Sequence, residues 1–361
     1  MKIITILGTR PEIIRLSLII GKLDKNSNHV LVHTGQNFTE SLNTIFFDQL
    51  KVRKPDYFLN ARGATIGEQI SQIIERTEKV LVKEKPDALL ILGDTNSGLS
   101  CIPAKRLHIP VYHMEAGNRC YNDKVPEEIN RRIIDHSSDF LMPYTQRSKE
   151  NLVREGIDRN KIFVTGNPIN EVILRFKKQI DTNTILNKLK IKKDKYFLIT
   201  MHRAENVDNN TNLKSLVNAL EKLHSIYGYP IICSLHPRTA DKMKKFNISI
   251  TNKDIRFLTP MGFFEFIKLE QNAFCVLSDS GTVQEECSIL MVPNVTMRDV
   301  TERPETLECG SNILSGLTVA DIIQSVKLVA NLKSKWSAPE EYKEKNVSDK
   351  VLRIIFSRFD F

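Results

Sequence analysis

The sequence predicts an α/β protein with two doubly wound parallel sheets, and three observations lead to this fold class. Short apolar segments rich in Ile, Val and Leu alternate with segments of helical periodicity, which is typical of parallel strands joined by crossover helices. This alternation weakens after Gly166 and then starts again. The chain has 361 residues, more than the roughly 250–300 at which a single hydrophobic core usually stops growing, so two domains are expected.

The first half of the chain contains the candidate strands of one sheet. They are residues 2–8, 29–35, 87–93, 109–115, 140–144 and 161–166. Residues 66–82 lie between the second and third of these segments, and their apolar positions recur at the spacing of an amphipathic helix. A buried parallel sheet flanked by helices is therefore expected in a first domain of residues 1–170.

The second half contains the candidate strands of another sheet. They are residues 196–202, 229–236, 255–260, 274–279 and 293–297. A basic stretch over 177–195 precedes them and is typical either of a linker or of the solvated face of a helix. We expect a second domain of residues 171–345. Residues 346–361 predict a terminal helix, capped by Ser348 or Asp349, that packs back on the first domain.

Composition and charge restrict the class of protein. With 41% hydrophobic and 26% charged residues, the chain is expected to fold without long disordered segments. Its formal charge of +9 favours acidic partners such as nucleic acid, anionic lipid or phosphorylated metabolites. No basic segment is interleaved with aromatic residues, and no apolar stretch approaches the ~18 residues that cross a bilayer. Neither a nucleic acid nor a membrane is therefore the expected partner.

The six cysteines favour a reducing compartment, because no two of them have the two-residue gap of a zinc knuckle or a redox motif. His113 and Glu115 share one face of a candidate strand, but no third metal ligand lies at a recognisable spacing. We therefore expect a cytoplasmic protein without a metal site.

The residues that follow each strand are the candidates for function, because ligands bind beyond the carboxyl ends of the strands in doubly wound sheets. The first strand is followed by GTRPE (8–12), which has neither the three glycines of a dinucleotide fingerprint nor the lysine of a P-loop. Arg10 at this turn and Arg15 one turn later suit a phosphate group. The alternative is that both arginines lie on an exposed helix start.

Three carboxylates are candidates for chemistry in the first half. Asp94 and Glu115 each come at the end of a strand, where a charge is costly unless it is paired or used. Glu127 follows in PEEINRR, where a proline and acidic residues also suit the first turn of a helix for structural reasons alone.

The second half contains the main phosphate-binding candidates. His202 and Arg203 follow its first strand and suit a diphosphate or a leaving group. The segment SDSGTVQEE (278–286) opens a helix whose free amides suit a phosphate, with a glycine that allows close approach. The alternative there is a capping box between Thr282 and Glu285. Residues 298–305 add further cations.

Seven short motifs, in the same order along the chain, give a resemblance to a known family. They are GTRPE, GDTNS, MEAGNR, PEEINRR, MHRAEN, DSGTVQEE and TERPE. Together they resemble the non-hydrolysing UDP-N-acetylglucosamine 2-epimerases over essentially the full length of the chain. The resemblance implies a glycosyltransferase-B-like fold of two Rossmann-like domains facing a cleft, a homodimer, and a reaction without a nicotinamide cofactor or a metal.

The implied reaction inverts C2 of a UDP-N-acetylhexosamine, for the synthesis of surface polysaccharide precursors such as those of lipopolysaccharide or capsule. UDP leaves by anti elimination to give a 2-acetamidoglycal and returns after the sugar has turned its other face. On this resemblance Asp94, Glu115 and Glu127 are the acid/base and electrostatic carboxylates, and His202 lies beside the diphosphate.

The resemblance also implies which residues bind the nucleotide. Those that match UDP-binding or substrate-binding positions are Arg10, Arg15, Phe266, Ser280, Gly281, Thr282, Glu286 and Arg303. Among them, Phe266 lies where the family contacts uracil, and Glu286 is expected at the ribose hydroxyls.

The sequence does not decide which of two nucleotide sugars is the substrate. Arg15 stands where the family commonly has lysine, Thr282 replaces the second glycine of DSGG, and Asn118 replaces an apolar residue in EAG-x-R. The segments EAGNRC, VPEEINRR and NVSDKVLRII resemble the branch that converts UDP-2-acetamido-2,6-dideoxy-L-talose to UDP-N-acetyl-L-fucosamine. That nucleotide and UDP-N-acetylglucosamine are both candidates. A UDP-sugar-dependent glycosyltransferase is the alternative class, because it shares the fold.

Overall fold

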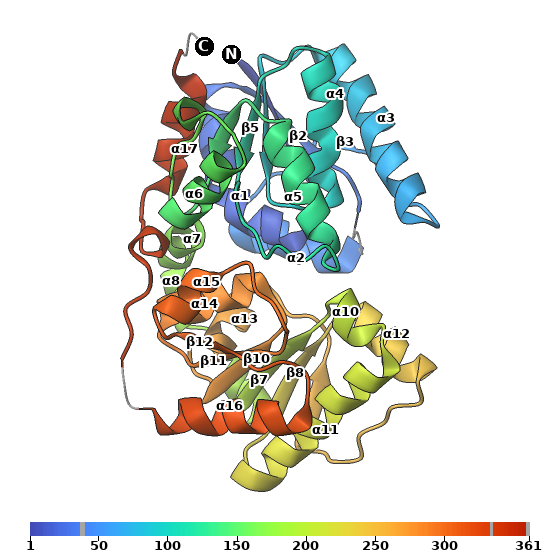
Figure 1. The fold of residues 1–361 in the computed structure, drawn as a ribbon, viewed down its shortest axis with the longest axis vertical. Helices are drawn as coiled ribbons and strands as arrows, with labels where there is room; N and C mark the ends of the chain where they lie inside the picture. Colours follow the sequence, from blue (N-terminus) through green and yellow to red (C-terminus); the bar gives the residue numbers. More distant parts are fainter. Residues whose placement is uncertain (37–39, 333–334, 359–361) are drawn as a thin grey trace. The chain divides into compact units, whose positions relative to one another are not determined.

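Two six-stranded sheets with surrounding helices make up the protein, and every strand pairs in parallel with its neighbours (Figure 1). The structure, a computed structural model, describes residues 1–36, 40–332 and 335–358. It divides into a first unit of Met1–Arg175 with Glu340–Phe361 and a second unit of Phe176–Pro339. The predicted fold class is confirmed; the sequence had placed the boundaries after residues 170 and 345.

The sheet of the first unit has the strand order β3-β2-β1-β4-β5-β6. Its strands are β1 (Lys2–Leu7), β2 (Asn28–His33), β3 (Tyr57–Phe58), β4 (Ala88–Leu92), β5 (Val111–Met114) and β6 (Phe140–Met142). The strand order reverses between β1 and β4, at the centre of the sheet. In a doubly wound sheet, ligands bind beyond the carboxyl ends of the strands at such a point.

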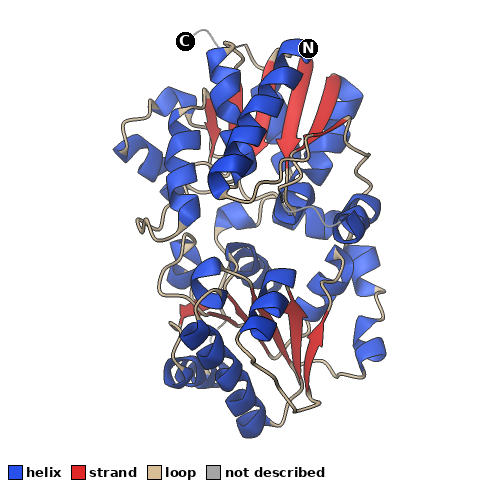
Figure 2. Cartoon of the chain, turned by 90° about the vertical axis from the view of Figure 1, so that its right-hand side faces the viewer, coloured by secondary structure: helices blue, strands red, loops and turns tan. Residues whose placement is uncertain are grey.

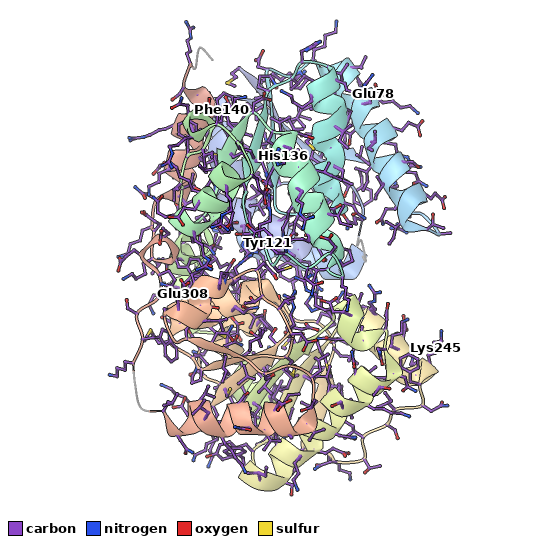
Figure 3. The ribbon with its side chains drawn as sticks, viewed as in Figure 1. Glu78, Tyr121, His136, Phe140, Lys245 and Glu308 are labelled. Atoms are coloured by element: carbon purple, nitrogen blue, oxygen red, sulfur yellow. The ribbon has the colours of Figure 1, made fainter. Side chains whose placement is uncertain are left out.

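Helices cover both faces of this sheet (Figures 1 and 2). They are α1 (Arg10–Asn26), α2 (Glu40–Leu50), α3 (Ile66–Glu84), α4 (Cys101–Arg106), α5 (Pro126–His136), α6 (Gln146–Arg154), α7 (Ile169–Arg175) and α17 (Val347–Phe356), with 3-10 turns η1 (Asn96–Ser100), η2 (Arg159–Lys161) and η3 (Glu340–Tyr342). Helix α3 has the amphipathic pattern expected over 66–82, since it buries Ile73, Val80 and Leu81 whereas Glu78 points to solvent (Figure 3).

Two details of the first sheet differ from the prediction. Residues 161–166 form no strand, because only Ile162 makes a bridge, to Leu141 of β6. Beyond it the amide of Phe163 donates to the carbonyl of Leu141 (2.8 Å), so this segment follows β6 without completing a ladder. Strand β3 was not predicted, because its two residues are too short to show a periodicity.

The C-terminal helix α17 packs against α1 and α7 of the first unit. Its side chains Val347, Val351 and Ile355 are buried. The ammonium of Lys22 on α1 lies 2.6 Å from the carboxylate of Asp349. The predicted caps are wrong, because Asn346 is the N-cap residue and Ser348 instead donates its amide to the carboxylate of Glu171 (2.8 Å).

The sheet of the second unit has the strand order β12-β11-β10-β7-β8-β9. Its strands are β7 (Phe197–Met201), β8 (Ile231–Leu235), β9 (Ile255–Leu258), β10 (Cys275–Ser278), β11 (Asn294–Thr296) and β12 (Asn312–Leu314). The order reverses between β7 and β10, so their carboxyl ends mark the corresponding ligand position in this unit. Only the three-residue β12 was not predicted.

Helices also surround the second sheet (Figure 2). They are α8 (Lys177–Asp181), α9 (Ile185–Leu189), α10 (Ala204–Val207), α11 (Asn210–Tyr227), α12 (Pro237–Lys245), α13 (Phe263–Glu270), α14 (Gly281–Leu290), α15 (Pro304–Glu308) and α16 (Val319–Asn331). The basic stretch 177–195 contains α8 and α9, which bury Ile180 and Ile185 and leave most of their lysines exposed. Over the described ranges, no helix is both long and apolar enough to span a membrane.

The docking of α17 leads to a prediction about stability. Replacing the buried Ile355 with Ala is expected to lower the free energy of unfolding of the first unit by about 2–4 kcal/mol, because it leaves a cavity against the rest of that unit. Hydrogen exchange of the α1 and α17 amides measures this loss. The exposed Arg353→Ala on the same helix is the control and should stay within about 0.5 kcal/mol of the wild type. Equal losses in both variants would contradict the packing role.

Candidate active site

The turn from β1 to α1 is held by a buried glutamate. One oxygen of Glu12 accepts the amide of Thr9 (2.9 Å) and the amide of Gly8, and the other accepts the hydroxyl of Thr95 after β4 (2.6 Å). Burial raises the pKa of Glu12 to about 7 despite these hydrogen bonds, and the charge of Asp94 adds to the rise. Glu12 therefore joins the ends of the two central strands.

Gly8 has a steric reason to be glycine at this turn. A Cβ atom there would lie 2.1 Å from the hydroxyl of Thr34 and 2.2 Å from that of Ser97. Glu12 was not predicted as a site residue, although Thr9 and Glu12 form a capping box whose T-x-x-E pattern is visible in the sequence.

Arg10 and Arg15 begin α1 at this edge, and neither is exposed. Arg15 is almost fully buried, and Arg10 is half-buried. Burial lowers the pKa of the Arg10 guanidinium from its ordinary value. The alternative of two arginines on an exposed helix start is therefore wrong, because neither side chain is exposed.

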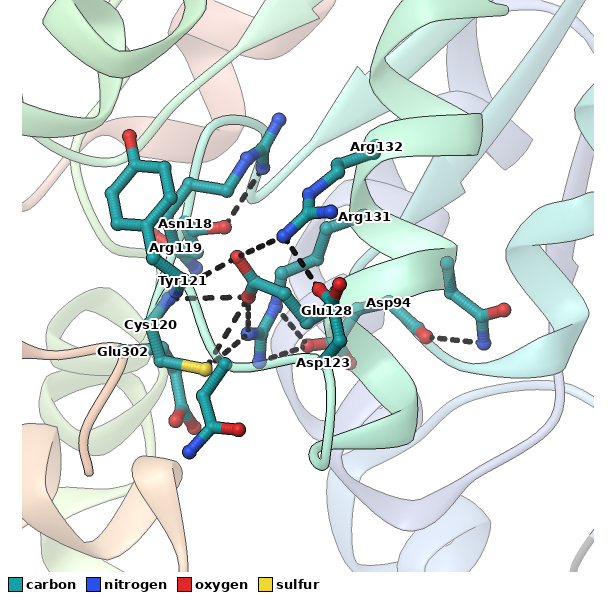
Figure 4. A network of polar contacts seen from close by, with 12 residues as sticks. Asp94, Asn118, Arg119, Cys120, Tyr121, Asp123, Glu128, Arg131, Arg132 and Glu302 are labelled. Carbon is teal, nitrogen blue, oxygen red and sulfur yellow. Dashed lines mark hydrogen bonds and ion pairs between the residues drawn. The ribbon is translucent and has the colours of Figure 1, made fainter. Parts of the chain in front are cut away.

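Asp94 leaves β4 and is held by an arginine from α5 (Figure 4). The guanidinium of Arg131 contacts the carboxylate of Asp94 through Nε (2.8 Å) and Nη2 (2.7 Å), and its Nη1 contacts Glu128 (2.7 Å). Glu128 also accepts the amides of Cys120 (3.1 Å) and Tyr121 (3.0 Å). Burial opposes ionisation of Glu128, but these amides and Arg131 outweigh it and lower its pKa.

The two adjacent glutamates at the start of α5 thus have different surroundings. Glu128 is fully buried in the network of Figure 4, whereas Glu127 is partly exposed in the first turn of the helix. Glu127 was predicted as a site residue and Glu128 was not, because the motif PEE does not show which glutamate faces inward. Asp94 keeps 24% of its side chain exposed.

Glu115 follows β5 with a left-handed backbone (φ 65°) that directs its side chain to the same edge. Its carboxylate accepts the amide group of Asn118 (3.3 Å) and the hydroxyl of Tyr144 (3.4 Å). A Cβ on Gly93 would lie 3.5 Å from this carboxylate, so Glu115 sits beside the residue that precedes Asp94. The structure therefore places the carboxylate of Glu115 beside the turn that leads into Asp94.

His113 and Asp135 fix the position of the loop that carries Glu115. The ring of His113 contacts Asp135 through Nδ1 (2.9 Å) and the carbonyl of Gly93 through Nε2 (2.9 Å). Asp135 also accepts the amide of Gly117 (3.1 Å) and pairs with Arg119 (2.8 Å). Both nitrogens of His113 are thus engaged in hydrogen bonds. In the part of the chain that is described, no three His, Cys, Asp or Glu side chains are grouped so that they could hold a metal ion.

In the second unit, a buried aspartate organises the carboxyl ends of β7 and β10. Asp279 accepts the amides of His202 (2.9 Å) and Arg203 (2.9 Å) and the side-chain amide of Asn206 (3.2 Å). Burial opposes its ionisation, but the adjacent His202 ring and these amides outweigh burial and lower the pKa of Asp279 to about 2. This arrangement holds the partly exposed ring of His202 at the edge of the sheet.

Helix α14 begins at the same edge with Ser280 as its N-cap residue. The hydroxyls of Ser280 and Thr282 contact each other at 3.0 Å, and no side-chain hydrogen bond from Ser280 caps the helix. The alternative of a capping box between Thr282 and Glu285 is wrong, because Glu285 binds the guanidinium of Arg303 instead. The first amides of α14 therefore suit an anion.

Arginines gather beside this helix start. Glu302 pairs with Arg298 (2.8 Å) and contacts Arg203 (3.3 Å), whereas the buried Arg303 pairs with Glu285. A Cβ on Gly281 would lie 2.5 Å from the carboxylate of Glu302, so a larger residue there would require the Glu302 side chain to shift. The remaining candidates lie on neighbouring helices, with Phe266 on α13 and the buried Glu286 on α14.

The structure thus has carboxylates at the strand ends of one parallel sheet, and free helix amides and arginines at the strand ends of the other. The comparisons with known proteins agree and define the family. Residues 21–356 match the UDP-N-acetylglucosamine 2-epimerase family. The chain belongs to this family, and it is therefore an isomerase.

Relatives and solved structures match nearly the whole chain. The UDP-N-acetylglucosamine 2-epimerase of Methanocaldococcus jannaschii is 44% identical, over 98% of this chain and 99% of the relative. The crystal structure of that protein with UDP-GlcNAc and UDP has a TM-score of 0.94, with coverage of 98% and 99%. A Pseudomonas aeruginosa UDP-2,3-diacetamido-2,3-dideoxy-D-glucuronate 2-epimerase is 38% identical, over 91% of this chain and 92% of the relative.

The buried Asp279 leads to a prediction about pH. Its folded pKa of about 2 lies below the value in the unfolded chain, so it stabilises the second unit at neutral pH, and this stabilisation is lost as the pH falls through about 2. Asp279→Asn should therefore lower stability at neutral pH by about 2 kcal/mol and flatten its dependence on pH in the acid range.

The fluorescence of Trp336 measures this effect. It is the only tryptophan of the chain, and its ring nitrogen donates to the carbonyl of Ser288 on α14 (3.1 Å), so it reports unfolding of the second unit in urea. Asp241→Asn, at an exposed position of α12, is the matched control and should behave as the wild type. If the stability of Asp279→Asn depended on pH in the acid range as that of the wild type does, the low pKa assigned to Asp279 would be wrong.

Proposed function

We propose that this protein interconverts UDP-N-acetylglucosamine and its C2 epimer, UDP-N-acetylmannosamine. The observation that carries this proposal is the full-length match to the Methanocaldococcus jannaschii enzyme, whose structure is described with UDP-GlcNAc and UDP. The Pseudomonas relative acts, by its name, on a different UDP-sugar, so the sugar must be tested directly. UDP-2-acetamido-2,6-dideoxy-L-talose, which would give UDP-N-acetyl-L-fucosamine, is the second substrate for that test.

The carboxylates of the first unit are proposed to carry the proton chemistry. The C2 hydrogen is not acidified by an adjacent carbonyl, so C1–O cleavage must develop positive charge at C1 that carboxylates stabilise. One of Asp94, Glu115 and Glu127 takes the C2 proton while the C1–O electron pair leaves with UDP. The resulting 2-acetamidoglycal then accepts a proton at C2 on its other face, and UDP returns to C1.

The polar groups around Asp94 and Glu115 support these roles. Arg131 holds Asp94 in two contacts, and Asn118 and Tyr144 hold the two oxygens of Glu115. A base positioned in this way needs little reorganisation when the proton moves. Glu127 is proposed as the third carboxylate because it is partly exposed beside this network.

The second unit is proposed to bind UDP. The N-terminal amides of α14, with Ser280, Gly281 and Thr282, would hold the diphosphate together with Arg303 and His202. Phe266 would contact uracil, and Glu286 would accept hydrogen bonds from the ribose hydroxyls. Arg10 and Arg15 of the first unit would add positive charge for the leaving diphosphate.

The mechanism needs neither a nicotinamide nor a divalent metal, because the C2 hydrogen leaves as a proton. We further propose a homodimer that acts in the cytoplasm on precursors of surface polysaccharides. Its six cysteines are all free thiols, as expected in a reducing compartment.

Turnover in D₂O tests the mechanism. A carboxyl group exchanges its proton with water, so the product should carry deuterium at C2, and long incubation should release free UDP with the 2-acetamidoglycal. Proton NMR of C2, with each of the two candidate nucleotides as substrate, measures both the sugar and the exchange. Full retention of the original hydrogen would exclude elimination, and release of UDP only with an added acceptor would indicate a glycosyltransferase.

The amide variants Asp94→Asn, Glu115→Gln and Glu127→Gln test the carboxylates. Each should lower kcat by about 10²-fold or more, because each removes a charge or a proton acceptor and little packing volume. Asp123→Asn is the control, since this carboxylate is 68% exposed and pairs with Arg132 at the surface. Wild-type turnover in all three variants would refute the assignment.

A further inference from the structure

Glu270, the last residue of α13, is a fully buried carboxyl group that the proposed mechanism does not use. It lies next to the apolar core between α13, α14 and the second sheet. The buried members of this core include Leu269, Ala273, Val276, Val283, Cys287 and Val292. A carboxyl group in such surroundings costs free energy unless another group satisfies it.

No hydrogen-bond donor in the described part of the chain reaches either oxygen of Glu270. The hydroxyl of Tyr196, which is also near, donates to the carbonyl of Leu269 instead. The carboxyl of Glu286 on α14 lies within hydrogen-bonding reach of the carboxyl of Glu270. Two ionised carboxylates only accept hydrogen bonds, so this contact is favourable only when one of them carries a proton.

We propose that Glu270 is a positioning residue that stays protonated and donates its O–H to the carboxylate of Glu286, which thereby presents its other acceptor sites to the ribose diol of UDP. This inference rests on the proposed role of Glu286 in the UDP site. It adds to that site a second carboxyl group that does not touch the nucleotide.

Electrostatics favour Glu270 as the protonated partner. Burial and the adjacent Glu286 raise the pKa of Glu270 well above its ordinary value. The other titratable groups nearby are Cys287 on α14, Cys275 on β10 and Tyr196 before β7, and burial raises the pKa of each of them. These groups are therefore neutral at neutral pH and do not compensate a second negative charge.

The shared proton has two consequences for binding. The pair carries one negative charge where two would repel the diphosphate of UDP. The O–H from Glu270 also fixes the orientation of Glu286, so that the two donating hydroxyls of the ribose meet a carboxylate that is already aligned. An apolar side chain in place of Glu270 would fill the core at lower cost to folding, as is common for buried ionisable groups.

Binding of two ligands by full-length variants tests the proposal. Isothermal titration calorimetry compares UDP with 2′,3′-dideoxy-UDP, which lacks both hydroxyls that Glu286 would accept. Glu270→Met should weaken UDP binding by about tenfold and leave dideoxy-UDP within about twofold, because it removes one charge-assisted hydrogen bond to Glu286. Glu270→Gln should restore most of the affinity for UDP, because its amide also donates.

Two further measurements separate positioning from structure. The melting temperature of Glu270→Met should not fall, since a buried carboxyl is replaced by an apolar group of similar size. The infrared C=O band of a protonated carboxylic acid should be smaller in Glu270→Gln than in the wild type at neutral pH. This band keeps the proposal testable even if the Met variant does not fold.

Three outcomes would refute the role of Glu270, and a fourth would refute the role of Glu286. Equal weakening of both ligands in Glu270→Met, no weakening of either, or an unchanged infrared band would refute the role of Glu270. Glu286→Gln serves as the reference: if that variant keeps the full preference for UDP over dideoxy-UDP, then the assignment of Glu286 to the ribose fails, whatever Glu270 does.

Discussion

Buried carboxylates that accept backbone amides hold the strand ends of both sheets. Parallel strands all finish at one edge, and the turns after them leave amide groups that neither the sheet nor the next helix satisfies. Glu12 accepts two such amides after β1, and Asp279 accepts two after β7. In the loop after β5, Glu128 accepts two backbone amides and Asp135 accepts one. These acceptors satisfy the amides and so stabilise the loops that carry the candidate site.

The acidic residues of the first unit therefore divide into two groups with different burial. Glu12, Glu128 and Asp135 are almost fully buried and saturated with hydrogen bonds from the protein, whereas Asp94 and Glu115 keep part of their surface exposed beside them. Asp94 and Glu115 also accept contacts from Arg131, Asn118 and Tyr144. What distinguishes them from the buried carboxylates is that part of their surface stays open to a substrate.

The sequence predicted the fold class and the strand-end positions because parallel strands are continuous apolar segments, and their ends are easily located. The strands β3 and β12 were not predicted, because they are only two and three residues long. Residues 161–166 were wrongly predicted as a strand, because a segment joined to β6 by a single bridge at Ile162 has the same apolar pattern as a fully paired strand. The carboxylates that hold the turns were not singled out, because the direction of a side chain is set by tertiary contacts. Glu285 shows this: its sequence neighbours suggest a cap, but its partner Arg303 lies 18 residues away along the chain.

The return of the chain from the second unit to the first has a consequence for synthesis on the ribosome. The second unit is a continuous segment, whereas the first consists of two segments, and the later one carries α17. The apolar side of α1 and α7 that α17 covers is therefore made long before its partner emerges. At ordinary rates of translation this interval is on the order of ten seconds or more, during which the second unit is free to fold. The early segment must stay able to bind α17 for that time. It is therefore the part of the nascent chain that most needs protection by chaperones.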